Sequence, residues 1–463
     1  MRGRILSYDD LPKMIKRLKR AAIDSYMHWN GFQIYEDHYT LKNSGNTFPH
    51  ESDSYEHVTR PDGDGEHGGE WKLDGLSGAK PKYKDVNFNE EFNHIRARID
   101  SALAPFINLP DPNGLVNPIE HCRRACRDLS CQASAEGGAA SGGGDIADQI
   151  RLIHSNLTSM SGMAIAQFKS TFIGKMATAV GGMHAIAICA GSALVAEQKI
   201  FEGARAAVLE TVQKGIEAFE KSTQWGLESF GIVLKIAEWA LQGFGMFMTE
   251  GPVGVGTALA DLGLTVATDL VSIWKDARKD ATSIPDGSYD TIMSGFEQVL
   301  KDINDQIKIC EETVLENITD NLERIRVDKT SYDLTIDPVE SNEEVIIIQR
   351  NLAEEITKVY MPRVCSDLLS TGKLVLGLAM PVARSSKIGI GADGPKSKFY
   401  ELTYLLYELI KDLSFEVDNG GANLQAAIND FAQADQENKA ELDKAVDDSA
   451  GKLKGSHPYD PWN

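Results

Sequence analysis

Apolar residues recur at helical spacing on both sides of the tripeptide Met160-Ser161-Gly162. Before it they step by three and four residues, and after it by four, so that each set lies on one face of a helix. The positions are Ile146, Ile150, Ile153, Leu157 and Met160, followed by Ala164, Phe168, Phe172 and Met176. Glycine permits the backbone dihedral angles that a tight reversal needs. The pattern therefore predicts two antiparallel helices over residues 145–222, with the turn at Ser161 and Gly162.

The same periodicity predicts further helices elsewhere in the chain. Their ranges are 11–29, 89–106, 292–325 and 343–360, and we expect the last to end near Pro362. Near the C-terminus, residues 400–415 and 422–446 flank Asp418-Asn419-Gly420-Gly421, where two glycines after an asparagine favour a helix break. We therefore predict an all-α fold, in which long antiparallel helical hairpins pack as an elongated bundle with an irregular N-terminal region.

Two stretches without helical periodicity suggest how the chain is divided. Residues 43–85 are rich in Gly, Asp, His, Ser and Lys, so we predict a long irregular segment. Residues 133–144 consist of Ala, Gly, Ser and Glu followed by more Gly, which is typical of a flexible linker. The predicted organisation is an N-terminal region over 1–132, this linker, a helical region over 145–340, a C-terminal helical hairpin over 341–450 and a disordered tail over 451–463.

Two of the most apolar stretches cover residues 230–248 and 253–274, with Gly251-Pro252 as a turn between them. Each is near the length of about 20 residues that crosses a bilayer. Each also holds two charges, and a central charge opposes constitutive insertion by about 3 kcal/mol. The hairpin is therefore either the buried core of a bundle or a segment that inserts after a conformational change. The membrane-insertion candidates are Phe230, Trp239, Phe244, Phe247, Gly251, Pro252, Val253 and Trp274.

Composition and charge narrow the classes of partner. The chain has 463 residues, a formal net charge of −21 and a pI near 4.9. This balance excludes nucleic acid as the main partner, because phosphate binding needs clustered positive charge. The N-terminal residues are basic, however, and Leu11, Ile15, Leu18 and Ala22 give them an apolar face. Such a helix either lies on an anionic membrane or partner, or is the solvated first helix of a bundle.

Few residues gather in a pattern with a known chemistry. Cys122, Cys126 and Cys131 lie close together, but their spacing differs from that of paired-Cys zinc knuckles, so we predict no metal site. Residues 389–394 read Gly-x-Gly-x-x-Gly, yet they lack the preceding strand and the opening helix of a dinucleotide site. We therefore predict no catalytic residues, no cofactor and no enzyme activity.

The turn motif resembles that of WXG100-type proteins, the small helical hairpins of the ESX (type VII) secretion systems. Such proteins carry Trp-x-Gly between two helices, and here Met160 stands in place of the Trp. Leu157 and Phe168 occupy positions that are usually apolar in those proteins. Residues 29–31 read Trp-Asn-Gly, a literal match, but no helical stripe follows them, so we rank them lower. The resemblance covers residues 145–222 and recurs over 400–447, and an ordinary hairpin of a helical bundle explains the same residues.

Type VII substrates also carry a Tyr-x-x-x-Asp/Glu export motif on a helix that follows a hairpin. Tyr404 and Glu408 match it, and Phe431 and Asp435 match it with Phe in place of Tyr. The spacing of four residues puts ring and carboxylate side by side on one helix face. The N-terminus lacks the apolar run of a signal peptide. The resemblance therefore implies secretion without a cleaved signal peptide, and the alternative location is the cytoplasm.

Three functional hypotheses follow from these patterns. The first is a non-enzymatic exported protein of type VII secretion, which acts through helix–helix contacts with itself or a helical partner; the resemblance adds a secretion ATPase as a partner. The second is an α-helical pore-forming, toxin-like protein that inserts the hairpin over residues 230–274 into membranes. The third is a structural assembly protein built from the same bundle.

Overall fold

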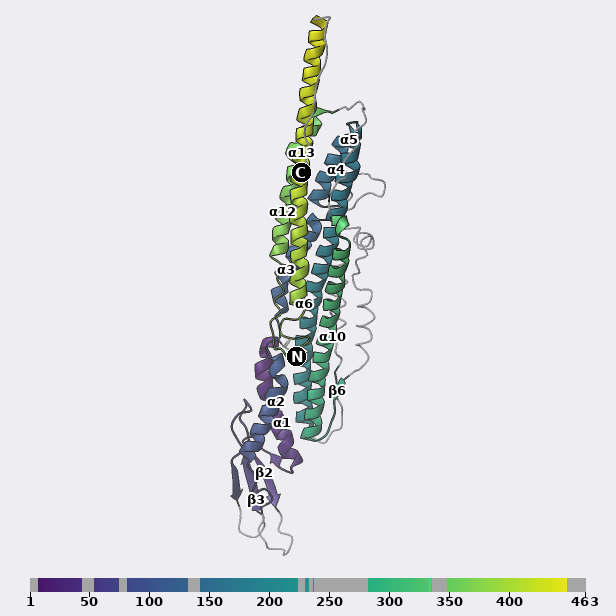
Figure 1. The fold of residues 1–463 in the computed structure, drawn as a ribbon. Helices are drawn as coiled ribbons and strands as arrows, with labels where there is room; N and C mark the ends of the chain where they lie inside the picture. Colours follow the sequence, from purple (N-terminus) through teal and green to yellow (C-terminus); the bar gives the residue numbers. More distant parts are fainter. Residues whose placement is uncertain are drawn as a thin grey trace.

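The computed structural model describes residues 7–43, 54–74, 81–131, 142–223, 230–232, 236, 282–332, 334 and 348–447. It is an elongated bundle of long helices with a small antiparallel sheet at one end (Figure 1). The predicted helical bundle is confirmed. The prediction of an all-α fold is wrong because of the N-terminal sheet.

The helices differ greatly in length, and two of them are longer than any other described helix of the bundle. The helical segments are α1 (Leu11–Trp29), α2 (Phe88–Leu103), α3 (Val116–Asp128), α4 (Asp145–Thr158), α5 (Met163–Gln167), the π-helical η4 (Phe168–Ile173), α6 (Gly174–Ser222), α10 (Tyr289–Val327), α11 (Arg350–Glu355), the π-helical η6 (Ile356–Tyr360), α12 (Met361–Leu376) and α13 (Lys396–Asp447). Short 3₁₀ turns η1 (Tyr8–Asp10), η2 (Ala104–Phe106), η3 (Pro112–Leu115) and η5 (Lys329–Tyr332) complete the described helical structure. The predicted helices over 11–29, 89–106 and 292–325 are confirmed by α1, α2 with η2, and α10.

Helix α6 is the centre of the bundle. It packs against α1, α3, α10 and α13, and its residues from Ala179 to Ala196 are buried on every side. The helical run Ile165–Ser222 has, within the described part of the chain, the length and apolar composition to cross a membrane, but its most apolar window is wholly buried. A helix that is apolar all round needs neighbours all round, so this run is the core helix of the bundle.

The turn at Met160-Ser161-Gly162 forms where the pattern predicts it. Gly162 has a φ of 131°, in the region that favours glycine, and Met160 is buried. The apolar stripe of α4 is also buried. The two arms differ from the prediction, however, because α4 is short and packs on α12, η4 and η6 rather than along the length of α6. The helices over 145–222 thus do not form a separate hairpin, because they pack mainly against other helices of the larger bundle.

A four-stranded sheet begins before residues 43–85, which we predicted to be irregular, and its last two strands lie within them. Its strands are β1 (Gln33–Ile34), β2 (His38–Asn43), β3 (Ser54–Thr59) and β4 (Trp71–Asp74), each antiparallel to the next. Tyr39 and Val58, which pair across β2 and β3, point into the core. Glu56 is also buried, and its carboxylate accepts hydrogen bonds from Asn43, Trp71 and the backbone N–H groups of residues 82 and 83. The inward face of β3 thus carries a charged residue. The sequence therefore lacks the alternation of apolar and polar residues that predicts a strand.

The predicted helix break at residues 418–421 is wrong, because α13 runs through it without interruption. The ring of Phe172 packs on the backbone of Gly420, and Met361 packs beside Gly421, so these glycines make room for neighbouring helices. The antiparallel partner of α13 is α12, and the chain between them, residues 377–395, forms their connection. The C-terminal hairpin therefore exists with arms other than those predicted.

The predicted helix end near Pro362 is also wrong. Pro362 lies in the first turn of α12, directly after η6. The missing N–H of proline and its ring are tolerated in a first turn, and the wider π turn before it accommodates the ring.

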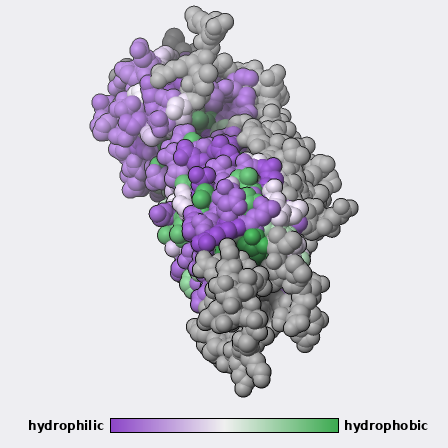
Figure 2. All heavy atoms as spheres, turned by 90° about the horizontal axis from the view of Figure 1, so that it is seen from above, coloured by the Kyte–Doolittle hydropathy of each residue, from purple (hydrophilic) through white to green (hydrophobic). Residues whose placement is uncertain are grey.

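The hydrophobic core is continuous along the bundle. One cluster of buried residues includes Leu18 of α1, Ile119 of α3, Val208 of α6 and Leu406 of α13, on both sides of the predicted linker over 133–144, of which residues 142–144 are described. Seen from above, hydrophilic residues cover most of the described surface, with hydrophobic residues in small groups between them (Figure 2). The N-terminal helices therefore share a core with the helices that follow.

Two alanine substitutions test the packing of the paired glycines in α13. Gly421→Ala should stabilise the protein by about 0.5–1 kcal/mol, since alanine is the better helix former and its Cβ would lie 3.5 Å from Met361 Sδ, an ordinary contact. Gly420→Ala should destabilise it by about 1–3 kcal/mol, because the new methyl collides with the buried ring of Phe172. Urea unfolding followed by circular dichroism measures both, and shifts of the same sign would contradict the packing.

Candidate functional site

The long antiparallel pair of α6 and α10 forms the scaffold of the candidate site. Phe296 of α10 packs against Gly215 of α6, and further along the pair Asn321 lies 3.4 Å from the sulfur of Cys189. With 49 and 39 residues, the helices are about 74 Å and 58 Å long at about 1.5 Å per residue. The apolar stripe that the sequence predicts on α10, from Ile292 to Ile325, is buried.

The lower end of this pair in Figure 1 is fastened to α1, near the sheet. Ser25 Oγ and Ser222 Oγ are 2.7 Å apart. The ring of Tyr289, at the start of α10, lies 6.0 Å from those of Tyr26 and Phe219. This end is also where the chain leaves α6 and enters α10, so the residues between the two helices begin and end here.

A two-stranded sheet closes the loop that these residues make. Strand β5 (Phe230–Ile232) pairs antiparallel with β6 (Thr282–Ile284), with Phe230 opposite Ile284. β5 contacts α6, and β6 contacts α10. The start of the apolar segment and residues 282–284, which lie beyond its end, are thus held together and against the helix pair.

Two glycines on the long helices receive the ends of the apolar segment. Ile236 is fully buried, and a Cβ at Gly203 of α6 would lie 3.0 Å from its Cα. At the other end, a Cβ at Gly295 of α10 would collide with the ring of Pro285. Ile236 thus lies against α6 several turns before the end of that helix. Ile236 and Pro285 are each seated where the neighbouring helix lacks a side chain.

Only the first of the membrane-insertion candidates lies in the described part of the chain. Phe230 is the first residue of β5. The others lie outside the described residues; they are Trp239, Phe244, Phe247, Gly251, Pro252, Val253 and Trp274.

A buried charge cluster connects the same two helices to the loop between α12 and α13. Arg384 of this loop forms an ion pair with Glu311 of α10, and both side chains are fully buried. Arg384 also lies 5.0 Å above the ring of Phe201 on α6. The backbone N–H of Ile390 donates to the other oxygen of Glu311 at 2.9 Å. Two turns before Gly203, the cluster thus fixes the loop against α6 and α10.

Glu197 of α6 is the third charged residue of this cluster. It is fully buried, and neither of its carboxyl oxygens has a hydrogen-bond partner among the described residues. Burial, and then the charge of Glu311, raise the pKa of Glu197 well above its usual range. Burial also raises the pKa of Glu311 to about 7, against the opposing effect of Arg384. We conclude that Glu197 carries a proton at neutral pH, because a buried carboxylate without a partner is costly.

Sequence reasoning missed this cluster, although a weak signal was present. Glu311 follows Cys310 and precedes Val314, so it sits beside the apolar stripe of α10, and Glu197 ends a long apolar run. Arg384 belongs to a stretch that reads as a polar loop. Gly389, the first glycine of the Gly-x-Gly-x-x-Gly pattern, has a φ of 57°, and a side chain there would collide with Glu311. The glycine pattern thus serves close packing around the buried acid.

The export-motif candidates lie along α13. Tyr404 is 59% exposed, and Glu408 follows one turn later, 3.7 Å from Lys411. Phe431 is 41% exposed, and Asp435 follows on the same helix. Figure 1 shows that the C-terminal part of α13 extends past the ends of the neighbouring helices. Tyr404 and Phe431 are therefore accessible from solvent and lie several turns apart.

The clustered cysteines are packed in the core of the bundle. Cys122 donates to the backbone oxygen of Ala187 on α6 at 3.1 Å. A hydrogen bond with Cys122, together with burial, raises the pKa of Cys126 well above its usual range. Within the described ranges, no group of three or more His, Cys, Asp or Glu side chains is arranged to hold a metal ion.

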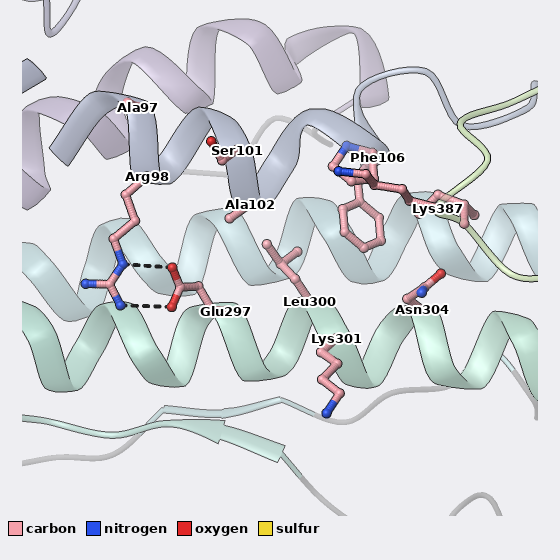
Figure 3. Close-up of a pocket in the computed structure, with 12 residues that line it drawn as sticks. Ala97, Arg98, Ser101, Ala102, Phe106, Glu297, Leu300, Lys301, Asn304 and Lys387 are labelled. Carbon is pink, nitrogen blue, oxygen red and sulfur yellow. Dashed lines mark hydrogen bonds and ion pairs between the residues drawn. The ribbon is translucent and has the colours of Figure 1, made fainter. Parts of the chain in front are cut away.

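A cavity of about 600 Å³ lies between α2, α10 and the loop that carries Lys387 (Figure 3). Arg98 crosses its edge with two parallel hydrogen bonds of 2.8 Å to the carboxylate of Glu297. Such a bidentate pair fixes orientation as well as distance. It holds α2, and with it the sheet end of the molecule, against α10.

Comparison with known proteins gives no relative for this chain: no family model, curated protein or solved structure matches it.

The pH dependence of stability tests the charge cluster. A raised carboxyl pKa means that the folded state holds its proton more tightly, so the contribution of Glu197 to stability falls as pH rises above about 4.3, where this group ionises in the unfolded chain. Glu197→Gln, which is neutral at every pH, should therefore be more stable than the wild type at pH 8 by more than about 1 kcal/mol, since one pKa unit is worth about 1.4 kcal/mol. At pH 4 the two should be equal.

Denaturant unfolding at the two pH values measures this difference. Glu312→Gln is the matched control, because Glu312 follows Glu311 on α10 but is exposed and pairs with Lys308. Equal pH dependence in wild type and Glu197→Gln would contradict a protonated Glu197.

Proposed function

We propose that this protein is an α-helical pore-forming protein, whose apolar segment over residues 230–274 leaves the bundle and enters a membrane. The observation that supports this most is the seating of that segment. Its start forms β5, which pairs with β6 beyond its end, and Ile236 and Pro285 lie against Gly203 of α6 and Gly295 of α10. We infer that release of these contacts frees the segment while the contacts among the long helices remain.

The composition of the segment supports the same proposal. Its two apolar stretches are each near the length of about 20 residues that spans a bilayer, and Gly251-Pro252 makes a turn between them. The four charges within them are Lys235, Glu238, Asp261 and Asp269. Charged residues inside membranes face a protein interior or a water-filled cavity. A single hairpin offers neither, so several copies assemble around an aqueous pore.

The buried charge cluster supports a conditional change of this kind. Glu197 lies on α6, the helix whose Gly203 contacts Ile236, and Glu311 lies on α10, whose Gly295 contacts Pro285. Buried charges of this kind stabilise a fold weakly, because their desolvation offsets their attraction. A bundle with such a cluster on the helices that contact Ile236 and Pro285 is poised to rearrange.

Type VII export remains a second candidate, with one observation in its favour. The ring of Tyr404 is exposed on α13, and Glu408 lies one turn further on, as recognition by a partner requires. The C-terminal turn that we expected beside Gly420 is absent, so this proposal rests on one hairpin, the turn at Gly162. Assembly through helix contacts, the third hypothesis, has no observation that separates it from these two.

A disulfide lock tests the departure of the segment from α6. A Cβ at position 203 would lie 3.6 Å from the Cβ of Ile236, within the range of about 3.5–4.5 Å that disulfides require. Oxidised Gly203→Cys/Ile236→Cys should release no dye from liposomes, because the segment stays bound to α6. Adding a reductant should restore release to the wild-type level. The control is Ile236→Cys alone, which retains the native cysteines, and leakage by the oxidised double variant would contradict the proposal.

A pair of substitutions separates membrane insertion from export. Trp239→Asp places a charge in the first apolar stretch and should reduce dye release at least about tenfold, since a central charge costs about 3 kcal/mol. Trp29→Asp, at a Trp that is 55% exposed on α1, is the matched control and should leave release unchanged.

Tyr404→Ala removes the exposed ring and should leave dye release unchanged. The second candidate would be favoured by two results together. A strain with a type VII system would export the wild type but not Tyr404→Ala, and the wild type would release no dye from liposomes.

A further inference from the structure

We propose that the cavity between α1, β1 and the end of α6 is a binding site for a phosphate-bearing anion, with Arg20 as its principal donor. The cavity has a volume of about 820 Å³ and is lined mainly by polar side chains. One wall is a face of α1 that carries Arg17, Arg20 and His28. Spacings of three and eight residues place these side chains on one side of the helix. The site is distinct from the apolar segment, and the proposal stands whether or not that segment enters a membrane.

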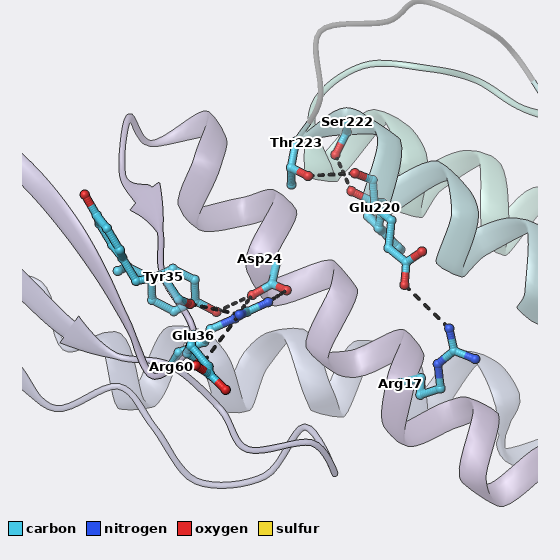
Figure 4. Close-up of polar contacts among 10 residues, drawn as sticks. Arg17, Asp24, Tyr35, Glu36, Arg60, Glu220, Ser222 and Thr223 are labelled. Carbon is cyan, nitrogen blue, oxygen red and sulfur yellow. Dashed lines mark hydrogen bonds and ion pairs between the residues drawn. The ribbon is translucent and has the colours of Figure 1, made fainter.

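A second arginine forms a neutral wall of the cavity (Figure 4). Arg60 Nε donates to Asp24 at 2.8 Å, and its Nη2 donates to the other oxygen of the same carboxylate. Its remaining Nη1 donates to the backbone oxygen of Tyr35 at 2.8 Å. Asp24 also accepts from Tyr39 Oη at 2.7 Å. Each nitrogen of Arg60 thus donates a hydrogen bond within the protein, and its charge is paired with that of Asp24, so this pair neither attracts nor repels a ligand strongly.

Arg20 differs because its guanidinium has no carboxylate partner. In the described ranges it makes no ion pair, and its Nε is buried without a hydrogen-bond acceptor. Gly63, which also lines the cavity, lies close to the guanidinium, since a Cβ there would be in ordinary contact with Nη1 at 3.9 Å. A buried N–H without an acceptor is costly, and the planar fork of arginine matches phosphate oxygens. An anion in the cavity would satisfy this donor.

Arg17 supplies the second positive charge. Its Nη2 lies 3.6 Å from Glu220, and both side chains are 54% exposed. Such a surface pair is worth at most about 1 kcal/mol, so Arg17 turns toward a stronger acceptor at little cost. Three arginines and two carboxylates line the cavity, which leaves one net positive charge before His28 is counted. The net charge of −21 does not cancel it, because distant acids are screened beyond about 8 Å in physiological salt.

The position of the cavity suggests what the anion touches. Glu220 and Thr223 line it from the last turn of α6 and the residue that follows. From there the chain runs to β5 and the apolar segment. A bound phosphate therefore lies beside the point where the chain leaves the long helix. Its source is either a phospholipid headgroup or a soluble phosphate ester, which share the chemistry that Arg20 recognises.

The experiment measures binding by the full chain in two arms. Calorimetry with inorganic phosphate tests a soluble ligand, and co-sedimentation with phosphatidylcholine vesicles, with and without phosphatidic acid, tests a headgroup. Arg20→Gln should weaken binding about tenfold or more in whichever arm the wild type binds, as expected for lost hydrogen bonds to a charged group. Lys13→Gln is the matched control, because Lys13 is exposed on α1 and lies outside the cavity.

Each outcome decides the proposal. Wild-type binding in either arm that Arg20→Gln weakens and Lys13→Gln retains supports it, and the arm identifies the source. Binding in neither arm overturns it, as does binding that Arg20→Gln leaves unchanged. If Arg20→Gln fails to fold by circular dichroism, Arg20→Lys keeps the charge without the fork, and Arg17→Gln removes an exposed charge. Binding unaltered in both of these variants overturns the proposal equally.

Discussion

The packing of α6 against its neighbours is the constraint on which the rest of the structure depends. Over most of its first half this helix has no polar face, so every side must be covered. α1, α3, α10 and α13 each supply an apolar stripe for that purpose. The bundle is long because α6 is long, and its hydrophobic core runs without a break from the sheet end to the turn at Gly162.

The same constraint explains where polar groups are tolerated. Glu197 is buried because this part of α6 is surrounded by other helices. Arg384 of a loop and Glu311 of α10 are buried beside it. Replacing such a cluster by apolar residues commonly leaves a protein as stable or more stable. Its position near Gly203, where Ile236 is seated, relates it to the segment that we propose to move. The bundle is therefore held mainly by apolar contacts, and the charge cluster adds little to its stability.

Much of this fold follows from periodicity, and the failures have specific causes. The stripe of α10 and the face of α1 are long and regular, so their helices were predictable. The sheet was not, since its strands are short and Glu56 points inward where an apolar residue is expected. The helix break predicted at Gly420 is wrong because a glycine that accommodates Phe172 looks the same in a sequence as a glycine that ends a helix.

The candidate sites depend on contacts between residues far apart in the chain. The apolar segment was visible from its composition, but Gly203 and Gly295 became meaningful only when Ile236 and Pro285 lay against them. Likewise, the sequence shows Arg17 and Arg20 on a basic helix, while the pairing of Arg60 with Asp24 and the buried Arg20 Nε without an acceptor are properties of the fold.

The central claim is that the segment between β5 and β6 moves from the bundle into a bilayer. It is tested most directly by an environment-sensitive fluorophore attached at Gly251→Cys, in the turn between the two apolar stretches. On addition of liposomes the account predicts a blue shift and an increase in emission, and quenching by a lipid-borne quencher. Unchanged emission with liposomes present at concentrations that bind the protein would contradict it.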